Sequence, residues 1–311
     1  VLFFSDLSYD FEQIALFGEG TYAINDRLAV TGGVRYYDFQ ENRTQVFDGI
    51  FADPIDSAGS TSADGFAPRL MLSYDVTEAT RLNAQISKGF RLGGINDPLN
   101  IPLCQPQDIA IFGGLTTWDD EVLWNYEVGV KSYMLDRAVY TELSVYRIDW
   151  SDQQISLQDP NAIFAYIGNA GKSYVNGLEL QINAQPTDFL SLNVGATYTD
   201  SRLSEDMPVP PIPAPTPENP NPEQAPYGFE GDRIPYSPKW SMAGSAQYEI
   251  PFSSELTGYA NANFNYRSVS YTAFNSTFGA SNYQELDDYF LMGVRFGVRY
   301  GAWDTSLFVD N

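Results

Sequence analysis

The sequence predicts an all-β protein that spans a membrane as an antiparallel up-and-down transmembrane β-barrel. Three observations lead to this fold class. Apolar and polar residues alternate with a period of two along many segments. Short turns and long acidic loops alternate strictly between those segments. Aromatic residues gather where the segments meet turns or loops, as in the two interfacial girdles of membrane barrels.

Composition agrees with this fold class. Of 311 residues, 43% are hydrophobic, 15% aromatic and only 18% charged, which favours ordered β structure over disorder. No run of about 18 apolar residues exists, so no membrane-spanning helix is expected. The chain opens at Val1 without a charged segment followed by an apolar one, and we therefore expect an interior fragment of a longer protein.

Twelve strands are expected in chain order. The clearest covers residues 177–184, where every second residue from Leu178 is apolar, and a polar turn at 185–188 leads into a second alternating segment at 189–198. Such a pair forms an antiparallel hairpin. The expected strand ranges are 8–23, 28–41, 65–76, 80–92, 121–134, 138–152, 173–184, 189–203, 236–249, 255–272, 284–300 and 303–311.

The connections between these strands are unequal. Short turns are expected near residues 25–27, 77–79, 135–137, 185–188, 251–255 and 301–302, and long loops at 42–64, 93–120 and 204–235, with shorter loops near 153–172 and 273–283. The three longest loops hold fourteen acidic and two basic residues. Short turns at one end and long loops at the other are typical of bacterial outer-membrane barrels. A soluble β-sandwich or propeller leaves this asymmetry unexplained.

The two faces of each strand differ in chemistry. Val294, Phe296 and Val298 share a face without charge, whereas Arg295 and Arg299 lie on the other face, which suits a water-filled lumen. We expect one aromatic girdle at Tyr22, Tyr74, Tyr133, Tyr248, Phe252, Tyr259, Tyr300 and Trp303, and another at Tyr36, Phe90, Trp124, Tyr198, Trp240 and Tyr266.

Charge and residue types exclude several functions. A formal charge of −23 repels phosphodiester backbones, so no nucleic-acid partner is expected. Without His and with one Cys, imidazole-dependent catalysis and Cys or His zinc sites are absent, and we predict no enzyme, no catalytic residue and no cofactor. The acidic run at residues 118–121 lacks the ligand spacing of a calcium loop, so no metal site is predicted.

Four segments resemble the TonB-dependent outer-membrane receptors. They are Asn169-Ala170-Gly171 followed by Gly177-Leu178-Glu179, then Ser87-Lys88-Gly89-Phe90-Arg91, Asn125-Tyr126-Glu127-Val128-Gly129-Val130-Lys131 and Leu307-Phe308-Val309-Asp310-Asn311. The resemblance implies about twelve strands, ten to twenty-one, of a 22-stranded barrel. Residues 1–311 are then part of a single barrel domain with no plug domain, the plug and nine strands lying upstream and one strand downstream. Arg35, Arg69, Arg81, Arg295 and Arg299 are expected to pair with carboxylates of the plug or of neighbouring strands.

The resemblance also implies a function. It is active uptake across the bacterial outer membrane of a scarce, bulky nutrient such as a ferric siderophore, cobalamin, haem, another metal chelate or an oligosaccharide. The implied partners are a TonB-type energy-coupling complex, reached through the plug segment, the nutrient ligand, outer-membrane lipid and lipopolysaccharide. The acidic loops would be extracellular and the short turns periplasmic. Alternatives are a passive porin or diffusion channel, and a surface enzyme or adhesin. The lack of His speaks mildly against haem.

Substrate-binding residues are expected at the loop apices, where aromatic rings stack on ligands and polar side chains form hydrogen bonds. The candidates are Arg91, Asn96, Asp97, Trp118, Asp119, Asp120, Tyr227, Phe229 and Asp232. The competing interpretation is that each is a solvated rim residue that holds the loops together. Residues 208–226 contain nine prolines and are expected to form a stiff, projecting spacer loop.

Overall fold

Twelve strands form one antiparallel sheet in which every strand pairs with its neighbours in chain order. The computed structural model describes residues 2–50, 54–99, 104, 109, 116–158, 165–169, 171–207, 228–274 and 283–311. The strands of this sheet are β1 (Phe4–Ala23), β2 (Leu28–Asp48), β3 (Ile55–Thr77), β4 (Thr80–Arg91), β7 (Glu121–Met134), β8 (Val139–Ser151), β11 (Lys172–Thr187), β12 (Leu190–Leu203), β13 (Trp240–Pro251), β14 (Leu256–Arg267), β17 (Tyr289–Tyr300) and β18 (Trp303–Asp310). The predicted all-β, up-and-down fold is confirmed.

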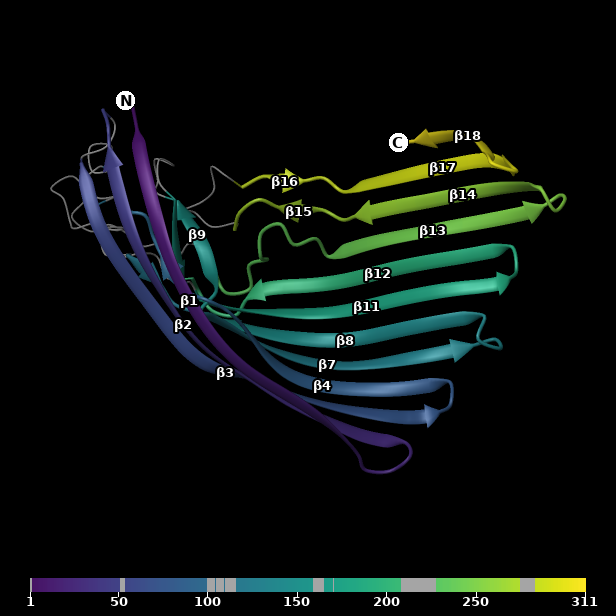
Figure 1. Cartoon of the computed structure of the whole chain (residues 1–311), viewed down its shortest axis with the longest axis horizontal. Coiled ribbons are helices and arrows are strands. Elements are labelled where there is room, and N and C mark those ends of the chain that lie inside the picture. The colour runs from purple at the N-terminus through teal and green to yellow at the C-terminus, as the bar shows by residue number, and fades with distance from the viewer. Residues whose placement is uncertain are drawn as a thin grey trace.

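Tight turns lie at one end of the sheet and the long excursions at the other (Figure 1). The turn before β2 is held by Asn25, whose Oδ1 accepts the backbone N–H of Arg27 and of Leu28 at 2.9 Å each. The turn before β8 has positive φ angles at Leu135, Asp136 and Arg137. The short turns were thus predicted near their observed places, except that residues 185–187, predicted as turn, still belong to β11 and the turn lies at 188–189.

The loop predicted at residues 42–64 is wrong, because most of it is strand. β2 continues to Asp48 and β3 begins at Ile55, with register kept from Asn42↔Ser60 to Phe47↔Ile55. Even-numbered residues of β3 in this part, such as Ser60 and Ser62, are exposed. Since the outer face there is as polar as the inner one, the period-two apolar signal disappears although the backbone still pairs.

Three small strand pairs lie inside the connections at the loop end. Two of them fall in predicted loops, whereas the residues of the third were assigned to the ends of the longer strands expected at 255–272 and 284–300. The three pairs are β5 (Gly94–Ile95) with β6 (Thr117–Trp118), β9 (Gln154–Gln158) with β10 (Ala165–Asn169), and β15 (Ser270–Tyr271) with β16 (Glu285–Leu286). They are too short to carry a readable hydrophobic period. None of the described residues forms a helix that is long and apolar enough to cross a membrane.

The register separates the sheet into an apolar face and a polar face. The apolar face exposes large hydrophobic side chains, for example Phe66 at 59%, Val128 at 61% and Phe296 at 61%. Such a band is costly in water and is what a membrane-spanning sheet presents to lipid. The polar face carries ion pairs between strands, such as Lys131 Nζ with Glu142 Oε1 at 2.7 Å.

The arginines predicted to face a lumen have two kinds of partner. Arg69 pairs with Glu19 at 3.4 Å, Arg81 with Asp75 at 2.6 Å and Arg299 with Glu249 at 3.0 Å. These pairings with neighbouring carboxylates were predicted. Two other arginines instead lie over aromatic rings, Arg35 over Phe90 at 6.0 Å and Arg295 over Phe308 at 5.0 Å. A cation over an aromatic ring gains energy from the ring quadrupole without a carboxylate.

Part of the predicted aromatic girdles is confirmed. On the apolar face at the loop end, Tyr36 contacts Phe66 at 5.1 Å between ring centroids, and Tyr198 contacts Trp240 at 4.9 Å. Tyr259 is an exception, because it lies on the polar face and donates to Asp304 Oδ1 at 2.7 Å. The girdle prediction for Tyr259 is therefore wrong. It rested on the distance of the residue from a turn, which does not reveal the face of the sheet on which a side chain lies.

Two further girdle predictions are wrong. Tyr133 opposes Tyr140 in the β7–β8 ladder, on the face that also holds the Lys131–Glu142 pair. Phe90 stacks on Tyr37, with ring centroids 3.6 Å apart, rather than facing lipid. Pairing between β3 and β4 ends at Arg69↔Ser87, so the last residues of β4 leave β3 and the simple alternation of faces no longer applies there.

Candidate functional site

Three excursions at the loop end of the sheet form the candidate site. We define the first excursion as residues 92–120, between β4 and β7, the second as residues 152–171, between β8 and β11, and the third as residues 204–239, between β12 and β13. The first excursion packs against β2 and β3, since β5 contacts both strands and a Cβ at Gly59 would meet Ile95. Strand ends therefore fix where each excursion begins and ends.

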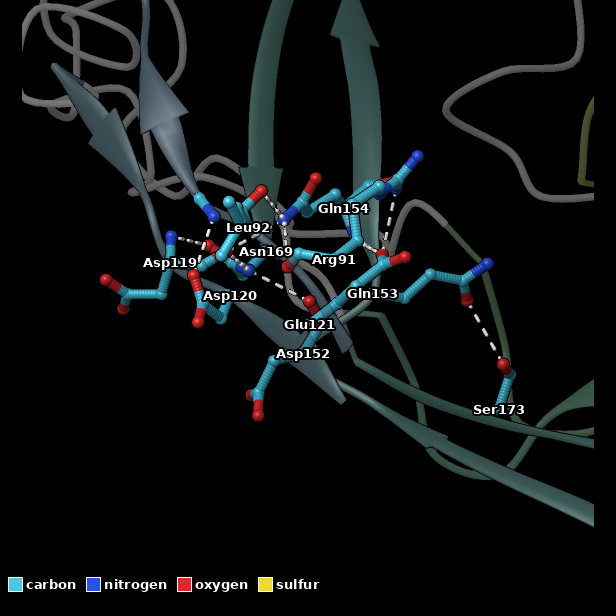
Figure 2. Close-up of polar contacts among 11 residues, drawn as sticks. Arg91, Leu92, Asp119, Asp120, Glu121, Asp152, Gln153, Gln154, Asn169 and Ser173 are labelled. Carbon is cyan, nitrogen blue, oxygen red and sulfur yellow. Dashed lines mark hydrogen bonds and ion pairs between the residues drawn. The ribbon is translucent and has the colours of Figure 1, made fainter. Parts of the chain in front are cut away.

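A buried carboxylate joins the first two excursions. Glu121 at the start of β7 has a side chain only 5% exposed, and its Oε2 accepts Nη2 of Arg91 at 2.9 Å and the backbone N–H of Gln154 at 2.7 Å (Figure 2). The side chain of Gln154 returns to the first excursion, where Nε2 donates to the Leu92 carbonyl at 2.9 Å and to the Asp119 carbonyl at 3.1 Å. Hydrogen bonds to a buried charge are stronger than neutral ones.

Asn169 makes a second connection between the same excursions. Its Oδ1 accepts the backbone N–H of Asp119 at 2.6 Å, and its Nδ2 donates to the carbonyls of Asp119 and Asp152 at 2.8 Å each (Figure 2). The side-chain amide of Asn169 thus forms three hydrogen bonds to backbone groups of two separate loops. The carboxylate of Asp119 takes no part in this and is exposed to solvent.

Asn96 and Asp97 attach the first excursion to β10 and β2. Nδ2 of Asn96 donates to the Ile167 carbonyl at 2.8 Å, and Oδ1 accepts the Ile167 N–H at 3.0 Å, which imitates a backbone pair. Oδ1 of Asp97 accepts Nη1 of Arg43 at 3.1 Å and Nε2 of Gln45 at 3.2 Å. Asn96 is buried, while the Asp97 side chain is 58% exposed.

Asp120 holds the base of the first excursion. Its Oδ1 accepts the backbone N–H of Gly93 at 2.7 Å, and its Oδ2 accepts the Tyr37 hydroxyl at 2.9 Å. Tyr37 is buried and stacks on Phe90. Trp118 covers Gly94, where an added Cβ would overlap the indole ring, so glycine lets the ring pack directly on the backbone of β5.

Tyr166 in β10 is a buried phenol of the second excursion. Burial raises the pKa of its hydroxyl above the ordinary value, and the nearby Cys104 and Asp97 raise it further. Desolvation disfavours the charged phenolate, so this side chain stays neutral and serves as packing at physiological pH.

The third excursion is held by a small hydrophobic cluster of Leu203, Met207 and Phe274, against which Ile155 of the second excursion and Ile234 also pack. Its outer turn contains two of the predicted residues. Oδ2 of Asp232 accepts the backbone N–H of Phe229 at 3.0 Å, and the Phe229 side chain is 39% exposed. Tyr227 and residues 208–226 lie outside the described residues.

The predicted binding residues are thus brought together in two groups. One group lies in the network around the first excursion and contains Arg91, Asn96, Asp97, Trp118, Asp119 and Asp120. The other group lies in a turn of the third excursion and contains Phe229 and Asp232. Many of their polar atoms hold one loop to another, but Arg91, Asp97, Asp119 and Phe229 also expose side chains that a ligand could contact. The sequence reasoning missed Glu121 and Gln154 as structural centres. Asn169 was noticed only as part of a family motif.

The chemistry available at this site is recognition by charge, hydrogen bonds and aromatic contact. Within the ranges that the structure describes, no group of three or more acidic, His or Cys side chains is placed to hold a metal ion. Most of the carboxylates at the site already accept hydrogen bonds from the excursions. The described parts of the excursions therefore form a hydrogen-bonded rim at the loop end of the sheet.

Comparisons with known proteins agree with this architecture. The family described as TonB dependent receptor-like, beta-barrel matches residues 3–311. The pesticin receptor of Yersinia enterocolitica serotype O:8 / biotype 1B is 22% identical over 234 residues, which are 75% of this chain and 30% of that receptor. The chain thus spans less than half the length of that curated relative.

Solved structures share the fold. The ferric yersiniabactin uptake receptor FyuA from Yersinia pestis matches with a TM-score of 0.75 at 18% identity, covering 100% of this chain and 42% of that chain. The siderophore receptor PiuA from Acinetobacter baumannii matches with a TM-score of 0.69 at 18% identity, covering 98% of this chain and 39% of that chain. These proteins are described as receptors, not as enzymes, in agreement with the prediction of no enzymatic activity.

Proposed function

Because this chain belongs to the TonB-dependent receptor β-barrel family, we propose that it forms the wall and part of the extracellular rim of an outer-membrane receptor that takes up a ferric siderophore with TonB-coupled energy. The observation that carries the proposal is the family match over residues 3–311 on a sheet with an exposed apolar face and a charged opposite face. A sheet of this kind has lipid on one side and a wet lumen on the other.

The ligand class is proposed from the relatives and from the rim. The relatives reported above include an uptake receptor for ferric yersiniabactin and a siderophore receptor. In this chain, the exposed side chains of Arg91, Asp97, Asp119 and Phe229 would contact the ligand, and Trp118 and Asp120 would support that surface. Guanidinium and carboxylate groups bind the oxygen-rich surface of a chelate by charge-assisted hydrogen bonds, and aromatic rings stack on its flat groups.

The proposed role of the loop network is to keep this surface rigid. Asn96, Asn169 and Glu121 join the first two excursions through direct hydrogen bonds, and Ile155 joins the second to the third. A pre-ordered rim binds more tightly because less conformational entropy is lost on association. Tyr227 and Asp232 are proposed to contact the ligand from the third excursion.

Residues 1–311 are proposed to be one part of a single barrel domain, with a plug and the segment that meets TonB encoded elsewhere in the protein. In this arrangement the long acidic loops are extracellular and the short turns periplasmic. Outer-membrane lipid and lipopolysaccharide would surround the apolar face. The polar face would then line the route that the ligand takes past the plug.

Uptake by cells tests the proposal. A strain without the gene for the whole protein is complemented with the wild type or with the double variant Trp118→Ala and Phe229→Ala, and growth is measured under iron limitation with a panel of ferric siderophores. We expect TonB-dependent growth on one class, and at least about tenfold more chelate required by the double variant, which equals about 1.4 kcal/mol of binding. The control is Trp303→Ala, whose 78% exposed side chain lies at a turn.

The same strains separate a receptor from a diffusion channel. Small-solute permeation that persists without TonB, combined with no growth response to any chelate, would contradict the receptor proposal and favour a porin. A loss of growth only in the TonB-deficient strain supports the receptor.

A further inference from the structure

We propose that the apolar face carries a specific binding site for one phosphate-bearing membrane lipid, with an acyl chain in a groove across β4, β7 and β8 and the phosphate on Arg147. The groove has a volume of about 520 Å³, and its lining includes Leu72, Ala84, Val128 and Val145 together with Arg147 and Asn176. This inference needs only the apolar face to meet lipid and does not depend on the transported ligand.

The register explains why a groove forms there. One row across the apolar face reads Leu72, Ala84, Val128 and Val145 on β3, β4, β7 and β8. The small side chain of Ala84 lies between the larger Leu72 and Val128, so the surface dips at β4. Since Val128 is 61% and Val145 55% exposed, the groove remains open to a hydrocarbon chain.

The next row toward the loop end changes from apolar to polar. It reads Leu70, Ile86, Tyr126, Arg147 and Asn176 across β3, β4, β7, β8 and β11. The groove therefore has hydrocarbon walls along most of its length and a guanidinium and an amide at one end, as an amphiphile requires.

Arg147 is expected to lie near the loop-side border of the apolar band. From Val139, where β8 leaves its turn, to Arg147 the strand covers eight residue steps, or about 26 Å at about 3.3 Å per residue. At a strand tilt of about 40° this is about 20 Å of height, close to the upper border of an apolar band about 25 Å tall. Positions of β8 below it on the same face, Thr141, Leu143 and Val145, carry no charge.

The guanidinium of Arg147 is held in place by neighbouring side chains and keeps one nitrogen that can donate a hydrogen bond. Nε donates to Asp149 Oδ1 at 2.8 Å, Nη1 donates to Asn176 Oδ1 at 3.4 Å, and the charged group lies 4.8 Å above the Tyr174 ring. Nη2 has no hydrogen-bond partner among the described residues, and the Arg147 side chain is 49% exposed. A phosphate oxygen can therefore accept from Nη2 without breaking the Asp149 pair.

Native mass spectrometry of the whole outer-membrane protein, released from detergent micelles, tests the site. The probes are phosphatidylglycerol, diacylglycerol with the same acyl chains, and inorganic phosphate. We expect one phosphatidylglycerol to be retained in preference to diacylglycerol, and no retention of inorganic phosphate. Arg147→Gln should lower retention of phosphatidylglycerol about fivefold, the change that corresponds to about 1 kcal/mol for one basic side chain at an anionic lipid surface.

A second variant and a control keep the result interpretable. Ala84→Phe fills the groove and leaves Arg147 intact, so it should also lower retention, while Arg295→Gln on the polar face should not change it. Heat-modifiable gel mobility reports whether each variant is folded, and the neutral Arg147→Met replaces Arg147→Gln if the latter does not fold. Equal retention of both lipids, binding of inorganic phosphate alone, or unchanged retention in folded Arg147 and Ala84 variants would overturn the proposal.

Discussion

Replacing Glu121 with alanine should loosen the second excursion without unfolding the sheet. The substitution removes the acceptor of the Gln154 N–H, which lies 2.7 Å from Oε2, and of Arg91 Nη2 at 2.9 Å. A partly buried N–H without a partner costs about 1–3 kcal/mol. The Arg91 side chain is 58% exposed and can be solvated by water, so losing its ion pair with Glu121 adds little to the loss of stability. The sum is about 2 kcal/mol of local stability.

Hydrogen exchange measured by mass spectrometry on the whole protein can detect this change. If the free energy needed to open the second excursion falls by about 2 kcal/mol, the β9 amides should exchange about 25-fold faster. Amides in the middle of β7 and β8 should keep their protection. Glu205→Ala is the matched control, because Glu205 pairs with Lys172 at 3.2 Å but both side chains are about half exposed, at 45% and 59%. In Glu205→Ala we expect amide exchange to speed up by at most about fivefold.

Two outcomes would refute this reasoning. The first is β9 exchange in Glu121→Ala that equals the wild type, which would mean that the buried carboxylate does not hold the excursions together. The second is an equal effect of Glu205→Ala, which would mean that burial does not decide the strength of these pairs.

Three further predictions concern the strands and the excursions. Gly177→Val should lower the thermal stability of the folded barrel, because an added Cβ would overlap the Tyr146 ring and force it to move, whereas Gly195→Val has open space and should not; the temperature at which heat-modifiable gel mobility changes distinguishes them. Asn169→Ala should lower local stability by about 2 kcal/mol, since three hydrogen bonds are lost at about 0.5–1.5 kcal/mol each, and exchange of the first and second excursions should rise together. The raised pKa of Tyr166 makes the stability of β9 and β10 constant below about pH 10 and lower above it, because the unfolded phenol ionises first; exchange against pH should show this fall, and Tyr166→Phe should abolish it.

The sequence alone determined the twelve main strands and their order. Each strand in the lipid-facing band has one face in hydrocarbon and one in water, so residues such as Val294 and Arg295 must alternate, and this pattern is local. Turns were readable for a similar reason, since Asn25 caps its own turn through neighbouring backbone groups. Where both faces of β2 and β3 are wet, beyond Asn42, the alternation vanished and strand was taken for loop.

Only the tertiary structure decided how the excursions meet. Asn96 bonds to Ile167, 71 residues away, and Gln154 bonds to Leu92, 62 residues away. Such bonds depend on which strand ends lie side by side, and a single polar residue in a loop carries no period that reveals its partner. The face chosen by Phe90 was also decided there, because it depends on where β4 separates from β3. Local alternation is set by the solvent on each side of a strand, whereas contacts between loops are set by the geometry of the whole sheet.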